Sequence, residues 1–194
     1  MLAAQQENGQ GHRTTLTQIL SYRLGFDADK IEIFQGDSAI TPPGTTGGAR
    51  MTPILGSAVA EVAAKTIDTA RAHAAEALEC AEEEVIFADG VFSSANTNHS
   101  ITIEDLALRL VPDNGAHPFD IKHQYETDGA TYPSGCHVVE LEVDPGTCKV
   151  DLLRYTVVDD FGAVINPMTL EGQVHGGIAP VSYTHLRAHE TCVH

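Results

Sequence analysis

Two short stretches of the sequence carry residue types that suit the binding of a polar, anionic ligand. Gly9-Gln10-Gly11 comes just before a predicted helix, and the loop that ends in Gly47-Gly48-Ala49-Arg50 precedes a second one. Glycine-rich loops can expose backbone N–H groups to anionic oxygens, and the N-terminus of a helix adds a favourable field. A glutamine side chain offers both a donor and an acceptor to a polar ring edge. These residue types could serve ligand binding, although Gly-Gln-Gly by itself is a common loop.

The same residues also have structural explanations. Gly9 and Gly11 can form an ordinary turn before a helix, and Gly47 and Gly48 can supply a positive φ in a loop. Gln173 lies in a segment that is predicted to become helical, where it can be an ordinary helix residue. The polar residues that are interpreted as packing or strand-end residues, and not as ligands, are His12, His175, Asp159 and Asp160.

The spacing of apolar residues predicts both helices and strands. Helices are predicted at 14–24, 53–78 and 102–110, with a further helix from about residue 169. Strands are predicted at 31–34 and 119–125, with two hairpins at 84–92 and 137–158. The hairpin turns are Ala88-Asp89-Gly90 and Asp144-Pro145-Gly146-Thr147. The pattern predicts an α+β fold, with one compact layer of mixed sheet and helices packed on it.

The long helix at 53–78 is expected to be buried. Its alanine and valine content and the spacing of Ile54, Ala58, Val62 and Ile67 favour a helix face inside the core. Gly56-Ser57-Ala58, at its beginning, would allow another backbone to come close.

Composition argues against several classes of partner. The formal net charge of −16 argues against nucleic acid and anionic membranes, since both bind clustered Lys and Arg. The glutamates between 76 and 84 are interpreted as a solvated helix end. No apolar run reaches the roughly 18 residues of a membrane span, and residues 1–9 lack the order of a signal peptide. The cysteines show no framework spacing and are expected to be reduced thiols in a cytoplasmic protein: Cys80, Cys136, Cys148 and Cys192.

The last fourteen residues, 181–194, differ from the rest of the chain. Three histidines in this tail, together with Glu190 and Cys192, resemble a zinc-ligand cluster. The histidines are His185, His189 and His194. The peptide VSYTHLRAHET also matches, codon by codon, an adapter that transposase-based sequencing libraries attach to DNA, and Pro180 fits a codon shared by gene and adapter. We therefore expect residues 181–194 not to be native, and a real metal-binding tail is the alternative.

Three segments, in order along the chain, resemble the molybdenum hydroxylases, the family of xanthine dehydrogenase, aldehyde oxidase and carbon monoxide dehydrogenase. The first is Gly9-Gln10-Gly11-His12 with Gln35-Gly36-Asp37. The second is Thr45-Thr46-Gly47-Gly48-Ala49-Arg50 with Gly56-Ser57-Ala58. The third runs from Asp159-Asp160-Phe161-Gly162 to Glu171-Gly172-Gln173-Val174-His175-Gly176-Gly177. The likeness covers nearly all of residues 5–180, so residues 1–180 are identified as an internal fragment of the molybdopterin-binding large subunit.

The resemblance implies a role for each segment. Gln10, with Gly9 and Gly11, would contact the cofactor, and Gly47-Gly48-Ala49-Arg50 would line the pocket of molybdenum and pterin. Gln173 would hydrogen-bond the pterin. The family's general base is a glutamate in a Gly-x-Gly-Glu motif, which lies beyond this sequence. No catalytic or metal-ligating residue is therefore expected in the fragment, which should be inactive alone.

For the intact subunit the resemblance implies an oxidoreductase that hydroxylates an aldehyde, an N-heterocycle or a similar small molecule with oxygen from water. The implied cofactor is molybdenum–molybdopterin, expected in the cytosine dinucleotide form. The implied partners are iron–sulfur and FAD subunits or domains, which carry a 2Fe-2S cluster and FAD. In such enzymes the cofactor performs the redox chemistry, while the protein supplies position and hydrogen bonds.

Two other classes of protein are weighed against this one. A non-enzymatic metal-binding protein would use the 10 histidines and 4 cysteines, but those outside the tail have no ligand spacing. An acidic interaction module would use the glutamate-rich helix end.

Overall fold

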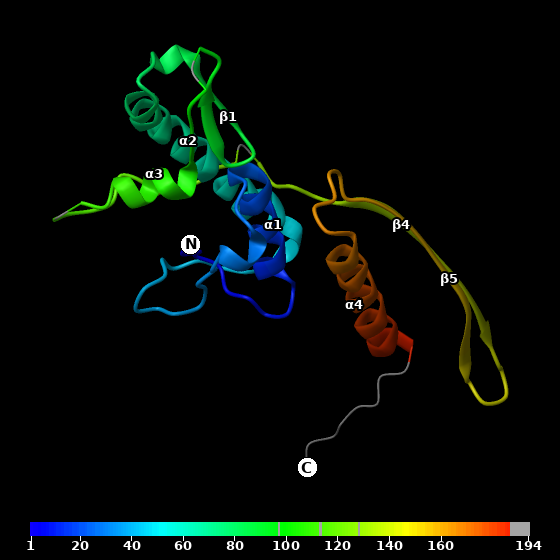
Figure 1. Ribbon diagram of the computed structural model, residues 1–194. Coiled ribbons are helices and arrows are strands. Elements are labelled where there is room, and N and C mark those ends of the chain that lie inside the picture. Colours follow the sequence, from blue (N-terminus) through cyan, green and yellow to red (C-terminus); the bar gives the residue numbers. More distant parts are fainter. Residues whose placement is uncertain (97, 113, 128, 187–194) are drawn as a thin grey trace. The chain divides into compact units, whose positions relative to one another are not determined.

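The computed structural model describes residues 1–186 except 97, 113 and 128; for residues 49 and 181–186 it describes only the backbone. The chain divides into two compact units, Met1–Thr131 and Tyr132–His194, and each is described by itself. Figure 1 shows the elements of both.

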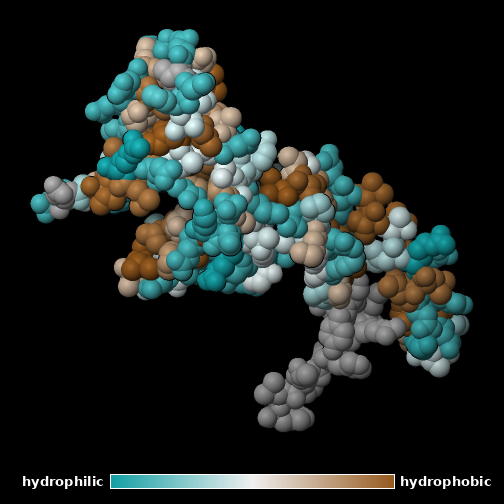
Figure 2. Space-filling model, in the orientation of Figure 1, coloured by the Kyte–Doolittle hydropathy of each residue, from teal (hydrophilic) through white to brown (hydrophobic). Residues whose placement is uncertain are grey.

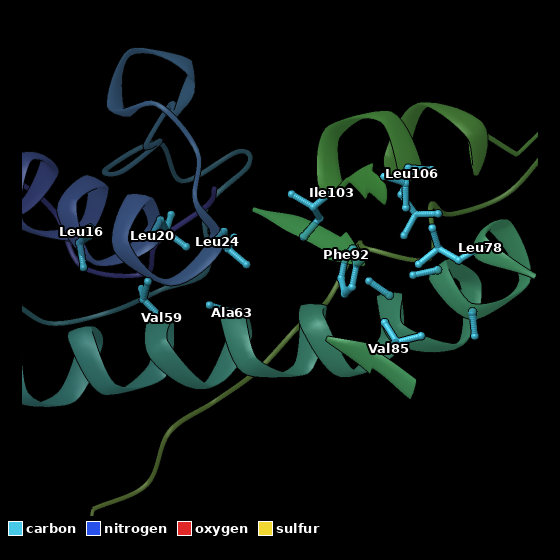
Figure 3. Packing of buried hydrophobic residues seen from close by; sticks show 14 of the residues in the cluster. Leu16, Leu20, Leu24, Val59, Ala63, Leu78, Val85, Phe92, Ile103 and Leu106 are labelled. Carbon is cyan, nitrogen blue, oxygen red and sulfur yellow. The ribbon is translucent and has the colours of Figure 1, made fainter. Parts of the chain in front are cut away.

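The first unit is built on two packed helices, α1 (His12–Leu24) and α2 (Ser57–Leu78). Leucines four residues apart form a stripe on one face of α1, because residues at this spacing lie above one another on a helix. The stripe faces small side chains of α2 (Figure 3). The residues of this contact are Leu16, Leu20, Leu24, Val59 and Ala63.

Both helices confirm the predicted ones, but the buried face of α2 differs from the expected face. Ala58, Val62 and Ile67 are half-buried at the edge of the packed face. Alanines allow the closest approach of neighbouring elements, so the centre of the face follows them rather than the larger residues. Its buried residues are Val59, Ala63, Thr66, Ala70, Ala74, Ala75 and Leu78.

The predicted first turn of the long helix is a separate π-type turn, Thr52–Gly56. Gly56 is buried there, and a Cβ built on it would lie 3.2 Å from Cδ1 of Ile19 on α1. The approach of another backbone was expected at this glycine, but the neighbouring group is the side chain of Ile19.

A three-stranded antiparallel sheet covers the other end of α2. Its strands are β1 (Val85–Ala88), β2 (Val91–Ser94) and β3 (Ser100–Thr102), and α3 (Ile103–Arg109) follows directly. β1 and β2 confirm the predicted hairpin, while β3 has only three residues and was not predicted. Phe92 of β2 is fully buried, and its neighbours in this part of the core are Leu78, Val85, Ile103 and Leu106 (Figure 3).

Thr102 begins α3, as the sequence predicts. Its Oγ1 accepts a hydrogen bond from the backbone N–H of Asp105 at 3.0 Å. Glu104 and Asp105 lie in the first turn, where the helix dipole stabilises negative charge.

The C-terminal end of α1 meets the β1–β2 turn backbone to backbone. Gly25 ends the helix at φ 71°, and its N–H donates to the carbonyl of Ser21 at 2.9 Å. A Cβ built on Gly25 would lie 2.2 Å from the backbone nitrogen of Gly90. Asp89 and Gly90 both have positive φ, as the tight hairpin turn requires. No residue larger than glycine fits at position 25.

Two predicted strands are not formed as strands. Residues 31–34 make only an isolated parallel bridge, in which Phe34 pairs with Leu2. Residues 119–125 were wrongly predicted, because they find no sheet edge in the described part of the chain. His123 is held instead by α2: its Nδ1 accepts from Lys65 at 2.8 Å, and its Nε2 donates to Glu61.

The second unit contains the second predicted hairpin, β4 (Ser134–Val143) and β5 (Val150–Asp160). The turn between them is stabilised by Asp144, whose carboxylate accepts from the N–H of Gly146 at 2.7 Å and the hydroxyl of Thr147 at 2.8 Å. These hydrogen bonds lower the pKa of the Asp144 carboxyl.

A 20-residue helix, α4 (Pro167–Leu186), follows the hairpin. It begins two residues before the predicted start. The side chain of Asn166 accepts from the N–H of Thr169 at 3.0 Å, which caps the helix.

The hairpin carries apolar side chains that no described helix side chain of its unit buries. Val139, Leu141 and Val143 alternate along one face of β4 and are 40%, 43% and 52% exposed. In Figure 2 brown, hydrophobic residues appear along the hairpin.

The α+β class is confirmed, and the sheets differ from the single mixed layer that was expected. The strands form two separate antiparallel sheets, of three and two strands. No described helix is long and apolar enough to cross a membrane. Cys80, Cys136 and Cys148 are free thiols, as expected. Cys192 lies outside the described residues.

Candidate functional site

The first candidate loop precedes α1 and is organised around one carboxylate. Oε1 of Glu7 accepts hydrogen bonds from the backbone N–H groups of Gly9 at 2.9 Å and Gly11 at 3.1 Å. Oε2 of Glu7 accepts from the N–H of Arg13 at 3.2 Å. Gly9 and Gly11 have φ of 95° and 77°, values that glycine adopts without strain. Glu7 therefore accepts from three backbone N–H groups at this loop that an external anion could otherwise use.

The ionisation of Glu7 reflects these contacts. Burial opposes its charged form, but the N–H groups of Arg13, Gly11 and Gly9, together with the nearby His12, outweigh burial and lower the pKa of the carboxyl. Because the folded-state pKa is below the unfolded one, these bonds stabilise the loop at neutral pH. That contribution is lost as the pH falls through the folded-state pKa.

Gln10 lies at the centre of this loop and is partly buried. Its Oε1 accepts a hydrogen bond from the backbone N–H of Asn8 at 2.5 Å. Its Nε2 has no hydrogen-bond partner among the described residues. The side chain is thus anchored at its oxygen and retains two donors for a ligand.

The second candidate loop contains a short 3-10 turn, Gly48–Arg50, before the π-type turn. Gly48 has the positive φ, 63°, that was considered for both glycines of this loop. Gly47 is instead extended. A Cβ on either glycine would meet no atom within 4 Å. The guanidinium of Arg50 is exposed and forms no ion pair with a described residue. The side chain of Ala49 lies outside the described atoms.

The N-terminal segment connects the two loops of the first unit. Oγ1 of Thr46 donates to the carbonyl of Gln6 at 3.0 Å, and Nε2 of Gln35 donates to the carbonyl of Gln5 at 2.6 Å. A Cβ on Gly44 would lie 2.6 Å from the carbonyl oxygen of Ala4, so this approach requires glycine. In Figure 1 both blue loops lie near the N-terminal end of α1.

Three buried polar atoms beside these loops have no hydrogen-bond partner in the described residues. They are Oε1 of Gln5, Nδ1 of His12 and Oε1 of Gln35. Buried polar atoms are usually hydrogen-bonded, so this part of the first unit retains unused hydrogen-bonding capacity.

The third candidate, Gln173, lies on α4 in the second unit and is exposed. The helix also carries Gly172, Gly176 and Gly177, and a Cβ on any of them would meet nothing within 4 Å. Glycine inside a helix costs about 0.5–1 kcal/mol relative to alanine. No contact within the described chain requires glycine at these positions, because each built Cβ lies in open space. His175 is also exposed on this helix.

The hairpin carries a cluster of three polar side chains that was not predicted from the sequence: His137, Tyr155 and Asp159. Nε2 of His137 lies 3.2 Å from Oδ1 of Asp159, and its Nδ1 lies 3.0 Å from the hydroxyl of Tyr155. A Cβ on Gly135 would lie 1.9 Å from the Asp159 oxygen, so glycine leaves room for this pair. Asp160 accepts from the N–H of Gly162 at 2.9 Å, which agrees with its interpretation as a strand-end residue.

No group of three or more His, Cys, Asp or Glu within the described residues has the arrangement of a metal site. The candidate zinc ligands of the tail lie outside the residues or side chains that the structure describes: His185, His189, Glu190, Cys192 and His194.

Comparisons with known proteins match nearly the whole chain. The sequence model of one family, described as the molybdopterin cofactor-binding domain, matches residues 2–180. The chain is 35% identical over 175 residues to the carbon monoxide dehydrogenase large chain of Hydrogenophaga pseudoflava, a match that covers 88% of this chain. It is 32% identical over 178 residues to the nicotine 6-hydroxylase large subunit of Paenarthrobacter nicotinovorans, again over 88% of this chain.

The fold agrees with a solved structure of a related enzyme. Cu,Mo-CO dehydrogenase in its carbon monoxide reduced state superposes with a TM-score of 0.77 at 34% identity, over 90% of this chain. The matches cover 22% of each of these three larger proteins, so the chain spans about a fifth of their length.

Proposed function

The chain belongs to the molybdopterin cofactor-binding domain family, and from this premise we propose that its candidate loops and Gln173 bind the molybdopterin cofactor of a molybdenum hydroxylase. The observation that carries the proposal is the hydrogen bonding of the Gln10 side chain. Its oxygen is fixed to the backbone of its own loop at 2.5 Å, while its Nε2 has no described partner. A pterin edge presents acceptors that this nitrogen can bind.

The second loop supports the proposal through charge and space. Arg50 is exposed, and its planar guanidinium suits the oxygens of a phosphate. Gly47 and Gly48 have no neighbour within 4 Å of a built Cβ, which leaves their backbone accessible to a ligand. We assign Gly47-Gly48-Ala49-Arg50 to the anionic and metal-proximal part of the cofactor.

On α4 the proposed contact is made by Gln173. The side chain is exposed, and Gly176 and Gly177, three and four positions further along, leave the helix surface on one side of it without side chains. A flat ring can approach such a surface closely, and the glutamine can donate to it and accept from it. This arrangement fits the role that the resemblance implies for Gln173.

When bound, the molybdenum cofactor supplies the redox chemistry by which oxygen from water is added to a carbon centre. The residues of this chain would bind and orient it, and none of them is proposed as a proton acceptor. For the intact subunit we propose the cytosine dinucleotide form, 2Fe-2S and FAD partner subunits or domains, and an aldehyde, N-heterocycle or similar substrate. We propose a cytoplasmic location for this complex.

We also propose that residues 181–194 are a translated sequencing adapter and not native sequence. The family match ends at residue 180, and Pro180 lies inside α4, where proline cannot donate a helical hydrogen bond. Resequencing the source DNA across codon 180 tests this directly. An uninterrupted gene through His194 would contradict it.

The proposed function predicts a defined metal content. The intact subunit, purified with its partner subunits, is expected to contain about one molybdenum and one pterin per subunit, because one cofactor fills one site. Elemental analysis for molybdenum and fluorescence of the oxidised pterin measure the two. A subunit that contains neither, after growth with molybdate, would favour an acidic interaction module instead.

A further inference from the structure

The Glu7 carboxylate fills the position that an external anion would otherwise take at the start of α1. Three backbone N–H groups converge on its two oxygens, from Gly9, Gly11 and Arg13. Convergent amides of this kind, next to a helix N-terminus, favour an anion. Here the anion belongs to the chain itself.

This arrangement fixes the loop on both sides of Gln10. Glu7 bonds to Gly9 before it and to Gly11 after it, so the backbone of Gln10 is held between two tethered residues. The Gln10 side chain is held in turn by the N–H of Asn8 at 2.5 Å. Of the polar atoms of the Gln10 side chain, Nε2 remains available to a ligand.

We propose that Glu7 is the positioning residue of this loop: its carboxylate fixes the amides of Gly9, Gly11 and Arg13 and thereby directs the Nε2 of Gln10 to the cofactor. This inference rests on the proposed function. It also assigns the chemistry of the contact. A phosphate would be repelled by the Glu7 carboxylate and would find the amides of Gly9, Gly11 and Arg13 occupied, which favours the neutral pterin ring as the group bound here.

The Glu7→Gln variant tests the proposal, because it keeps the size of the side chain and removes its charge. If the amide oxygen remains on Gly9 and Gly11, the new NH₂ group faces the N–H of Arg13, and two donors then oppose each other. Glu83→Gln is the matched control, since Glu83 is exposed and accepts no hydrogen bond from a described residue.

The first readout is amide hydrogen exchange in the full chain without cofactor. Glu7→Gln is expected to increase exchange at Gly9, Gly11 and Arg13 by about tenfold, as the loss of one charge-assisted hydrogen bond implies. Glu83→Gln should leave these amides unchanged. Unchanged exchange in Glu7→Gln would overturn the proposal.

The second readout is pterin release from the intact, cofactor-loaded subunit. Release from Glu7→Gln is expected to be about tenfold faster than from the wild type, and Glu7→Asp should restore part of the difference. Faster amide exchange with unchanged pterin release would overturn the positioning role while leaving the proposed function intact. A wild-type subunit that holds no pterin would defeat the proposed function and this inference together, whatever the exchange result.

Discussion

Replacement of Gly25 by alanine is expected to lower the free energy of unfolding of the chain by about 3 kcal/mol or more. Two costs add. A left-handed backbone costs a residue with a Cβ about 1–2 kcal/mol, and the φ of Gly25 is 71°. The new methyl group would also lie 2.2 Å from the backbone nitrogen of Gly90, so α1 and the β1–β2 turn must separate. Urea denaturation followed by circular dichroism measures the change.

Gly36→Ala is the matched control for this variant. Gly36 has a φ of 76°, close to that of Gly25, but its built Cβ has only an ordinary contact, 3.6 Å from Cβ of Gln6. Gly36→Ala should therefore show the backbone cost alone, about 1–2 kcal/mol. Equal losses for the two variants would show that the packing of α1 against the turn is not as described.

Replacement of Gln10 by alanine is expected to accelerate loss of the pterin from the intact subunit by about 10- to 100-fold. The variant removes the donor to the ring and the anchor of the loop at once, and each hydrogen bond contributes about 0.5–1.5 kcal/mol. Pterin fluorescence after separation of free cofactor from protein measures the rate.

Gln10→Glu separates the two contributions. A glutamate keeps an oxygen for the N–H of Asn8 and lacks the NH₂ donor. It should therefore release pterin nearly as fast as Gln10→Ala. Gln124→Ala, at an exposed loop residue, serves as the control and should behave as the wild type. Slow release from Gln10→Glu would assign the effect to loop shape and not to a hydrogen bond with the ring.

Local patterns were sufficient to predict the elements that are stabilised by local contacts. The leucine spacing of α1, the Asp89-Gly90 turn and the Thr102 cap all act within a few residues, and each is present in the structure. The prediction failed at 119–125, where a strand was expected. That segment is held by side-chain contacts of His123 with α2, which join residues about 60 positions apart and leave no periodic signal.

The buried face of α2 shows a second limit. Large apolar residues usually mark the core, but here the centre of the packed face is formed by Ala63, Ala70 and Ala74. Alanine is common on both faces of such a helix, so the pattern of large residues points to the edge of the face and not to its centre.

The candidate site was predicted from the resemblance, whereas its internal organisation was not. Spacing identified Gly9-Gln10-Gly11 as a loop before a helix, but it did not show that Glu7 occupies the loop amides. An acidic residue two positions before the first glycine was the available signal. The contact of Thr46 with Gln6 links segments 40 residues apart and could not be inferred from either segment alone.

The most direct test of the proposed function is an experimental structure of the intact, cofactor-loaded subunit, in which one distance decides the question. The Nε2 of Gln10 is predicted to lie within about 3.2 Å of an acceptor on the pterin ring, with Glu7 still bonded to the loop amides. A pterin bound beyond the reach of Gln10, with the loop at the start of α1 facing solvent, would contradict the account.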